Sequence, residues 1–151
     1  MSRDDVRTAA FDELDGRTGY LLWQLRESVF VVEQTCPYPE LDGRDLEPAT
    51  RHVWIEEQGR PVAYLRVLDD GPHARIGRVL VAPAHRGRGL AERLMRTALA
   101  VVGDRRSVLD AQSYLAGWYA RFGYEPTGEE FVEDGIPHVP MARQAPGTGV
   151  A

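Results

Sequence analysis

The sequence contains one cysteine, no lysine and no long apolar run. The single Cys36 excludes an internal disulfide and argues against a zinc site built on cysteines, so no metal is expected. No stretch reaches the roughly eighteen apolar residues of a membrane-spanning helix, and the N-terminus lacks the apolar core of a signal peptide. These absences predict a cytoplasmic protein that has no membrane partner.

All eighteen basic residues are arginine, and the formal net charge is −5. An acidic protein is a poor nucleic-acid binder, because such a partner demands a basic face. Many of the arginines nevertheless gather between Arg75 and Arg96. Such a local basic patch suits a small polyanionic ligand. Arg96 has a simpler explanation, since Glu92 lies four residues before it and can pair with it along a helix.

The length of 151 residues fits one domain with a proper core. We expect residues 1–143 to form this domain and residues 144–151 to form a flexible tail. The sequence has no internal repeat and no low-complexity tract. A homodimer is left open by the sequence.

The chain is organised around a strand, a glycine loop and a helix. The strand spans Arg75 to Val81, Gly87 and Gly89 follow in the loop, and apolar residues then recur at helical spacing from Leu90 to Val102. A glycine loop that leads into a helix N-terminus can bind a phosphate or pyrophosphate through free N–H groups and the helix dipole. A tight turn without a ligand is the alternative. The loop lacks the Gly-Lys-Ser/Thr of a P-loop and the third glycine of the dinucleotide fingerprint.

The remaining pattern predicts an α+β fold with one mixed, mostly antiparallel sheet and helices on both faces. We expect strands over 6–11, 52–57, 62–68, 107–111, 124–133 and 137–142, and helices over about 15–32 and 112–122. In the first helix, Arg26 is expected on the outer or site-facing side. The irregular segment 33–45 is expected to be ordered over a pocket. The acidic stretch Glu40–Glu47 indicates either a cationic substrate or a solvated loop.

Arg86, Gly89 and Ala91, spaced as Arg-x-x-Gly-x-Ala after the strand that ends Val79–Val81, resemble the acyl-coenzyme A loop of the GNAT family of N-acetyltransferases. The resemblance implies the acyl-CoA N-acyltransferase fold, in which the strands holding Val79–Val81 and Leu109–Ala111 splay apart. Coenzyme A would enter between them. The implied cofactor-binding residues are Val79, Leu80, Val81, Arg86, Gly87, Arg88, Gly89, Leu90, Ala91 and Gln112. Gln112 departs from the asparagine that many members carry there.

Trp118 to Tyr124 resembles the second signature of the family, whose tyrosine, here Tyr119, commonly lies beside the thioester sulfur. A phenol there can protonate the departing thiolate. The alternative for Tyr119 is a core aromatic residue on an amphipathic helix. Strings that include Glu33-Gln34-x-Cys36 and Gly135-Ile136-Pro137-His138 further resemble the ElaA-like acetyltransferases of bacteria.

The attacking amine needs a base, and the candidates are Glu33, Asp42, His52 and His138. Glu33 follows the apolar end of the first helix, where burial could raise its pKa, although a surface acid is equally plausible there. His138 is the other main candidate, against a purely structural role. His52 is expected to begin a strand, and Cys36 has no partner histidine that would make it a nucleophile.

These observations predict an acetyl-CoA-dependent N-acetyltransferase that moves an acetyl group to a primary amine of a small molecule or peptide, by direct attack in a ternary complex. Acetyl-CoA would be a co-substrate. The alternative is an acyl-CoA-binding sensor or interaction module that lacks catalysis. A nucleotide-dependent transferase is disfavoured by the absence of lysine and serine or threonine from the loop.

Overall fold

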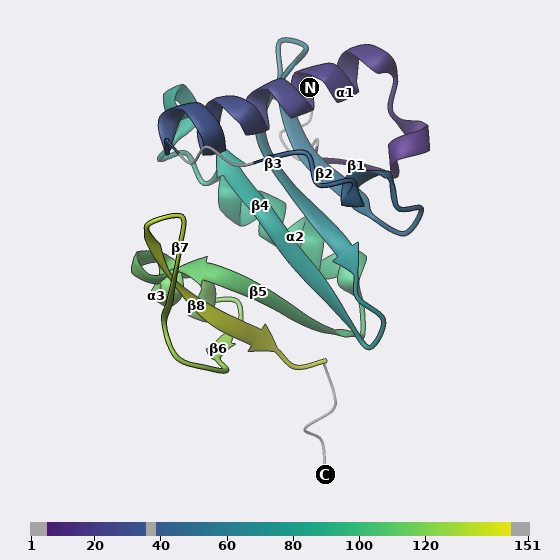
Figure 1. Ribbon diagram of the computed structural model, residues 1–151. Helices are drawn as coiled ribbons and strands as arrows, with labels where there is room; N and C mark the ends of the chain where they lie inside the picture. The colour runs from purple at the N-terminus through teal and green to yellow at the C-terminus, as the bar shows by residue number, and fades with distance from the viewer. Residues whose placement is uncertain (1–5, 36–38, 146–151) are drawn as a thin grey trace.

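The computed structural model describes residues 6–35 and 39–145 and contains one mixed sheet with helices on both faces (Figure 1). The interpretation of Cys36 and most of the expected tail, residues 146–151, lie outside the described residues. The strands are β1 Val6–Ala9, β2 Arg51–Glu57, β3 Arg60–Asp69, β4 His73–Val81, β5 Arg106–Gln112, β6 Glu125–Pro126, β7 Phe131–Glu133 and β8 Ile136–Arg143. Their order in the sheet is β1-β2-β3-β4-β5-β8-β6, with β7 paired to β8. The predicted fold class is therefore confirmed.

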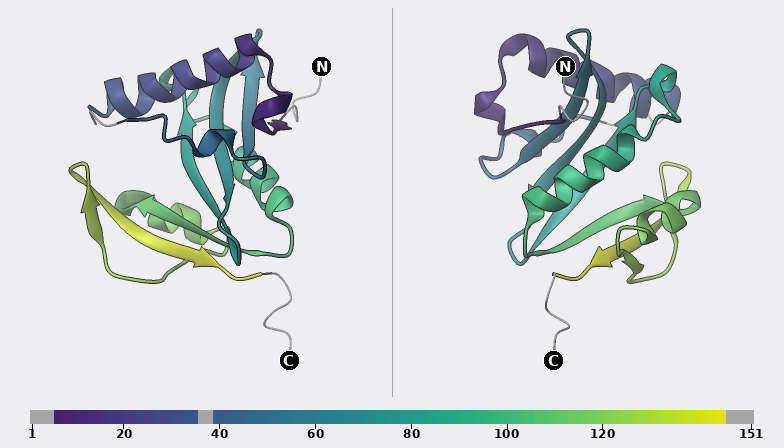
Figure 2. Two further views of the ribbon diagram at one scale, coloured as in Figure 1. Left: turned by 45° about the vertical axis from the view of Figure 1, so that its right-hand side comes forward. Right: turned by 180° about the vertical axis from the view of Figure 1, so that it is seen from behind.

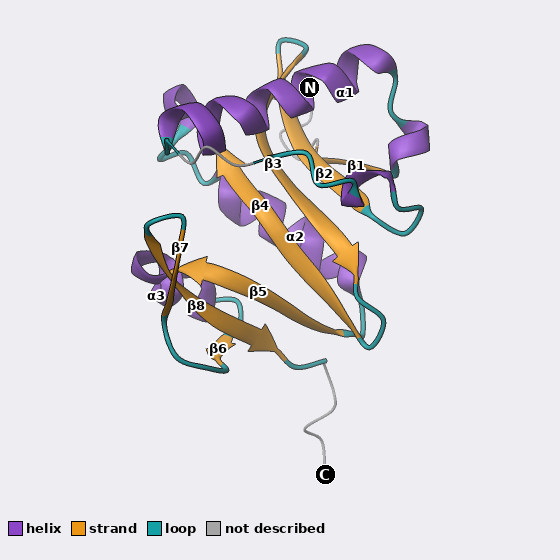
Figure 3. Ribbon diagram, viewed as in Figure 1, coloured by secondary structure: helices purple, strands orange, loops and turns teal. Residues whose placement is uncertain are grey.

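The helices lie on opposite faces of this sheet (Figures 2 and 3). Helix α1, Gly16–Arg26, covers one face, and α2, Leu90–Val102, covers the other. The shorter helical pieces are α3 Ala116–Ala120, the π-helix η2 Glu27–Glu33, and the 3₁₀ turns η1 Phe11–Glu13, η3 Arg44–Leu46, η4 Pro83–His85 and η5 Ser113–Leu115.

The first helix begins as predicted, because the Asp15 side chain caps it by accepting from the Thr18 N–H at 2.7 Å. It does not continue as an α-helix to Val32. From Glu27 the chain widens into the π-helix, a variant that is frequent at functional sites. The placement of Arg26 on an outer or site-facing side was wrong: its side chain is fully buried. Two carboxylates described below compensate its charge.

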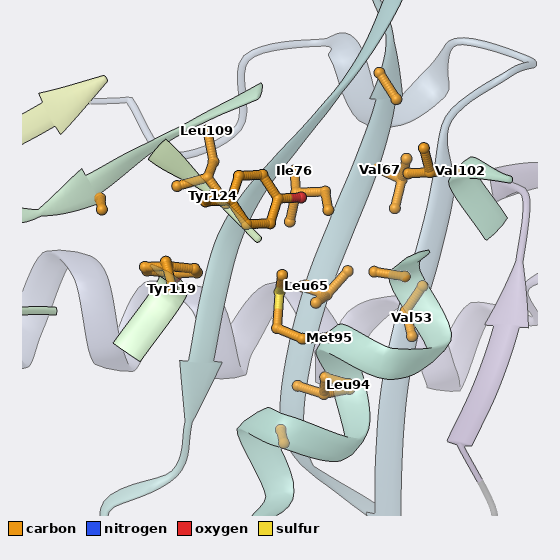
Figure 4. Close-up of a cluster of buried hydrophobic side chains, with 14 of the residues drawn as sticks. Val53, Leu65, Val67, Ile76, Leu94, Met95, Val102, Leu109, Tyr119 and Tyr124 are labelled. Atoms are coloured by element: carbon orange, nitrogen blue, oxygen red, sulfur yellow. The ribbon is translucent and has the colours of Figure 1, made fainter. Parts of the chain in front are cut away.

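Helix α2 follows its apolar period closely. Leu90, Leu94, Met95, Ala98 and Val102 are buried against the sheet. Figure 4 shows how two of them, Leu94 and Met95, meet apolar side chains from β2, β3 and β4. On the opposite sheet face, α1 packs a second, smaller apolar cluster. The two clusters fix the sheet between its helices.

The helix expected over 112–122 is shorter than predicted. Gln112 is the last residue of β5, and a 3₁₀ turn precedes the five-residue α3. Gly123, with φ of 96°, ends this helical segment as expected. The closing strand expected over 124–133 is also broken, into β6 and β7, while Asp134-Gly135 forms the predicted turn into β8.

The central strands β4 and β5 run parallel but pair only at their beginnings. Hydrogen-bonded register joins residues 73–75 to residues 106–108, and neither strand continues the pairing beyond these positions. Farther along, β5 pairs only with β8 and β4 only with β3. The two strands therefore separate toward their C-terminal ends, which confirms the expected splay (Figure 1).

Candidate active site

A cleft of about 1090 Å³ opens between the separated ends of β4 and β5. Its walls come from η2, β3, β4, the loop before α2, β5, α3 and the β7–β8 hairpin. The sequence-predicted residues that line it are Glu33, Val79, Leu80, Val81, Arg86, Gly87, Gly89, Leu90, Ala91, Gln112, Tyr119 and His138. Segments as distant in the sequence as η2 and the β7–β8 hairpin thus contribute to one cavity.

The loop before α2 leaves the helix N-terminus open to this cleft. Gly89 is the N-cap with φ of 77°, and no side chain caps the helix. Gly87 also has a positive φ, of 80°, and a Cβ at either glycine would point into open space. The free N–H groups of the first turn and the positive end of the helix dipole therefore face an accessible, concave surface. This is the geometry that an anionic group requires.

Arg86 connects this loop to the π-helix η2, which also lines the cleft. Its guanidinium donates through both terminal nitrogens to the Glu33 carboxylate, at 2.8 Å each, and its Nε donates to the Val81 carbonyl at 2.9 Å. The hydrogen bond from Arg86 holds the pKa of Glu33 below its usual range. Of the two alternatives for Glu33, the surface acid describes it and the burial-raised pKa does not, because its side chain is 40% exposed and ion-paired.

Arg88 is the one predicted loop residue that does not line the cleft. Its guanidinium instead binds Glu57 at the end of β2, with contacts of 2.6 and 3.3 Å. This pair ties the loop to the neighbouring hairpin.

Tyr119 on α3 lines the cleft and is almost fully buried. Its ring packs edge-on against Trp118 and Tyr124, at centroid distances of 5.0 and 6.3 Å. Burial raises the pKa of its phenol. Within the described parts of the chain, no group hydrogen-bonds to its hydroxyl. Tyr119 is therefore a neutral proton donor at ordinary pH, with its donor hydrogen available to a ligand.

His138 on β8 also lines the cleft. Its Nδ1 is 2.7 Å from the Ile136 carbonyl, and its ring stacks on Phe131 at 5.6 Å. Because a carbonyl oxygen only accepts, Nδ1 must carry a proton. In the neutral ring the lone pair is then on Nε2, which is the atom that can accept a proton.

The strand β4 is bulged where it borders the cleft. Tyr64 pairs with Leu80 and Arg66 with Gly77, so two residues, Arg78 and Val79, lie opposite one residue of β3. Arg78 adopts a positive φ of 55°, a conformation that costs a non-glycine residue about 1–3 kcal/mol. A bulge leaves backbone groups outside the ladder. Sequence reasoning missed it, because a regular apolar alternation gives no signal for it.

The acidic stretch after η2 faces inward. The Glu40 and Asp45 carboxylates bind Arg26 at 2.8 and 2.7 Å, and Asp42 binds Arg66 at 2.6 Å. Burial opposes the ionisation of Asp45, but the hydrogen bonds and charges of Arg26 and Arg66 together outweigh burial and keep the pKa of Asp45 below its usual range. Arginines neutralise these three carboxylates. The segment is therefore neither a solvated acidic loop nor a set of free negative charges that could bind a cationic substrate.

The surroundings of Asp42 and His52 argue against either residue as the base. The hydrogen bond from Arg66 lowers the pKa of Asp42, so Asp42 is a poor proton acceptor. His52 is fully buried in β2, with Nδ1 2.6 Å from the Tyr64 hydroxyl and Nε2 3.1 Å from the Asp45 carbonyl. Burial lowers the pKa of His52, and its ring does not line the cleft.

Within residues 6–35 and 39–145, no group of three or more His, Cys, Asp or Glu side chains is arranged to hold a metal ion. In the same part of the chain, no helix has the length and apolar character needed to cross a membrane.

Residues 24–145 match the model of a family described as acetyltransferase (GNAT) domain. The chain is 50% identical over 144 residues to a UPF0039 protein of Mycobacterium tuberculosis, covering 91% of this chain and 90% of that protein. It is 43% identical over 132 residues to protein ElaA of Escherichia coli, covering 83% and 86%. A crystal structure of an acyl-CoA N-acyltransferase from Pseudomonas aeruginosa superposes with a TM-score of 0.89 at 40% identity, covering 92% of this chain and 98% of that one.

Proposed function

Because this chain belongs to the GNAT acetyltransferase family, and within it is ElaA-like, we propose that it transfers an acetyl group from acetyl-CoA to a primary amine by direct attack in a ternary complex. Family membership itself makes the chain an acyl-CoA-dependent acyltransferase. The single observation that supports the finer proposal is the cleft between β4 and β5. It gathers an open helix N-terminus, a neutral phenol and an imidazole in one cavity.

The residues around the cleft fit the cofactor. The N–H groups at the start of α2 and the loop glycines suit the pyrophosphate, and the backbone of Val79–Val81, unpaired on the side toward β5, suits an extended amide-bearing arm. The Arg86 guanidinium is already paired with the Glu33 carboxylate. To bind a phosphate, Arg86 must therefore either bind both anions at once or release Glu33.

Acetyl-CoA supplies an activated thioester, in which a new C–N bond replaces the C–S bond. Tyr119 donates its phenolic proton to the sulfur as the C–S bond breaks. The register shift at Arg78–Val79 interrupts the regular ladder next to the cleft, and a backbone N–H group of this bulge would stabilise the negative charge on the carbonyl oxygen. The low dielectric around Tyr119 keeps the phenol protonated until that moment.

The proton of the attacking amine passes to His138 Nε2. Glu33 is the weaker candidate for this base, because its bidentate pairing with Arg86 stabilises the carboxylate and reduces its proton affinity. We assign Glu33 to holding Arg86 and the η2 wall. The amine gives one proton to His138 and the departing sulfur takes one from Tyr119, so the balance closes once His138 returns its proton through water to the Tyr119 phenolate.

Acetyl-CoA is expected to stabilise the folded protein. A ligand at a hundredfold excess over Kd adds about 2.7 kcal/mol, which corresponds to a rise in Tm of roughly 5–10 °C for a domain of this size. Thermal unfolding with millimolar acetyl-CoA, compared with the same concentration of ATP, measures the effect. Thiol release with a panel of primary amines then tests transfer. If acetyl-CoA leaves Tm unchanged, the cofactor assignment fails.

Gly89→Glu is expected to weaken acetyl-CoA binding at least tenfold more than Gly89→Gln. Both side chains carry the same backbone strain at φ of 77° and have nearly the same volume, but only glutamate adds a charge at the helix N-terminus. Calorimetric titration of both variants with acetyl-CoA gives the comparison. Equal dissociation constants for the two variants would mean that no anion binds at this N-terminus.

A further inference from the structure

The unusual backbone conformation of Arg78 is held by a residue from a distant loop. The Glu40 Oε2 accepts a hydrogen bond from the Arg78 Nε at 2.6 Å, and the Glu40 carbonyl accepts one from its Nη2 at 3.1 Å. The two residues are 38 positions apart in the sequence. Glu40 therefore binds the Arg78 guanidinium through both its side chain and its backbone carbonyl, at the bulge of β4.

Glu40 is itself fixed from the other side by Arg26. The Arg26 Nε donates to the same Oε2 at 2.8 Å, and its Nη2 donates to the same carbonyl at 3.2 Å. Glu40 is only 7% exposed and Arg26 is fully buried. The Arg26 guanidinium also lies over the rings of Trp23 and Tyr64, at 5.2 and 5.5 Å from their centroids. Glu40 cannot move without breaking a buried, doubly hydrogen-bonded ion pair.

We propose that Glu40 is a positioning residue: it holds Arg78, and through Arg78 the bulge of β4, in the conformation that turnover requires. This inference rests on the proposed function. A positive φ is unfavourable for arginine, so the backbone at Arg78 should return to an ordinary strand conformation unless its side chain is held in place. Relaxation would turn the backbone N–H groups at the bulge away from the reacting carbonyl, and small displacements of such donors cost large factors in rate.

We call the hydrogen bonds between Glu40 and Arg78 the clamp. Its position predicts a larger effect on turnover than on cofactor binding. Leu80 and Val81 keep their register with Tyr64 and Ala63 beyond the bulge. The anion-binding loop begins farther on, after Val81, and in the described parts of the chain its side chains form hydrogen bonds and ion pairs with Glu33 and Glu57, and with neither Glu40 nor Arg78. Loss of the clamp should therefore lower kcat and leave the dissociation constant of acetyl-CoA within about twofold.

The test combines Glu40→Gln, Arg78→Ala, Arg78→Gly and the double variant Glu40→Gln/Arg78→Gly. Glutamine keeps the size of Glu40 but loses its charge, and kcat should fall roughly tenfold or more. Arg78→Ala should lose as much, because alanine has neither the anchor nor a tolerance for positive φ. Arg78→Gly should lose less, because glycine adopts that φ freely. In the glycine background, Glu40→Gln should cause little further loss.

The opposite results overturn the clamp. An unchanged kcat in Glu40→Gln shows that the bulge holds itself. Equal losses in Arg78→Gly and Arg78→Ala show that the Arg78 side chain contacts the substrate directly. An undiminished effect of Glu40→Gln in the glycine background shows that Glu40 acts through another group.

Amide hydrogen exchange of the ligand-free protein tests the clamp without turnover. Glu40→Gln should speed exchange at residues 77–79 of β4, relative to β8 as an internal reference for global stability. If wild-type protein releases no thiol with any amine, the proposed function fails while this measurement still decides the clamp. Unchanged exchange at residues 77–79 overturns the clamp whatever the activity.

Discussion

Replacement of Tyr119 by phenylalanine is expected to lower kcat by about 10²–10⁴-fold, the usual value of general acid catalysis. Phenylalanine keeps the ring that packs against Trp118 and Tyr124, so folding and acetyl-CoA affinity should hardly change. No protein group of the described chain shares the hydroxyl, and its removal therefore leaves no buried partner unsatisfied. Thiol release with a panel of primary amines, together with calorimetric binding of acetyl-CoA, measures both quantities.

Tyr124→Phe is the matched control for this experiment. Its hydroxyl is 2.7 Å from the Ser107 hydroxyl, in the core and outside the cleft lining. Its loss should affect stability and leave kcat nearly unchanged. Equal turnover in wild type and Tyr119→Phe would remove the phenol from the mechanism. If wild type binds acetyl-CoA and releases no thiol with any amine, the protein is a binding module instead of an enzyme.

Arg26→Ala is expected to reduce the free energy of unfolding by about 3–5 kcal/mol, because it removes the buried guanidinium that binds both Glu40 and Asp45 and leaves these buried carboxylates with one arginine each, Arg78 and Arg66. Glu40 and Asp45 are 7% and 5% exposed, so water cannot replace the guanidinium. The loss is a large part of the roughly 5–15 kcal/mol that stabilises a typical domain. Urea unfolding followed by circular dichroism measures it.

Arg44→Ala provides the comparison for Arg26→Ala. Arg44 lies in the same segment of the fold and also binds two carboxylates, Glu47 and Asp70, but its side chain is 33% exposed. Its removal should cost less than about 1 kcal/mol. If Arg26→Ala does not fold, Arg26→Lys, which keeps the charge and loses the planar fork, should give an intermediate loss. Similar losses in Arg26→Ala and Arg44→Ala would contradict the role of burial.

The parts of the fold that rest on local pattern could be predicted from the sequence. The apolar period of α2, the capping Asp15 and the turn at Asp134-Gly135 are each set by neighbouring residues. The glycine loop before α2 was identified in the same way. The order of strands and helices follows from them, whereas the separation of the strands that hold Val79–Val81 and Leu109–Ala111 was expected from the family resemblance.

The features that could not be predicted depend on partners far along the chain. The burial of Arg26 requires carboxylates 14 and 19 residues away, and the pKa of Glu33 is set by an arginine 53 residues away. The π-helix and the bulge at Arg78 change the register by one residue without altering the apolar pattern. Glu40 looked like one acid among several, and only its two arginine partners distinguish it.

The separation of β4 and β5 also bears on which strand edges are open to pairing with another chain. Unpaired strand edges invite pairing with other chains, and proteins usually shorten or block them. Here the outer edges in the described parts of the chain are short: β1 has four residues, β7 has three, and β6 has two including Pro126. The longer unpaired edges lie inside the cleft and face each other. If the coenzyme A arm pairs with them as proposed, it covers backbone groups that are otherwise open to intermolecular pairing, and we then expect the ligand-free form to aggregate more readily.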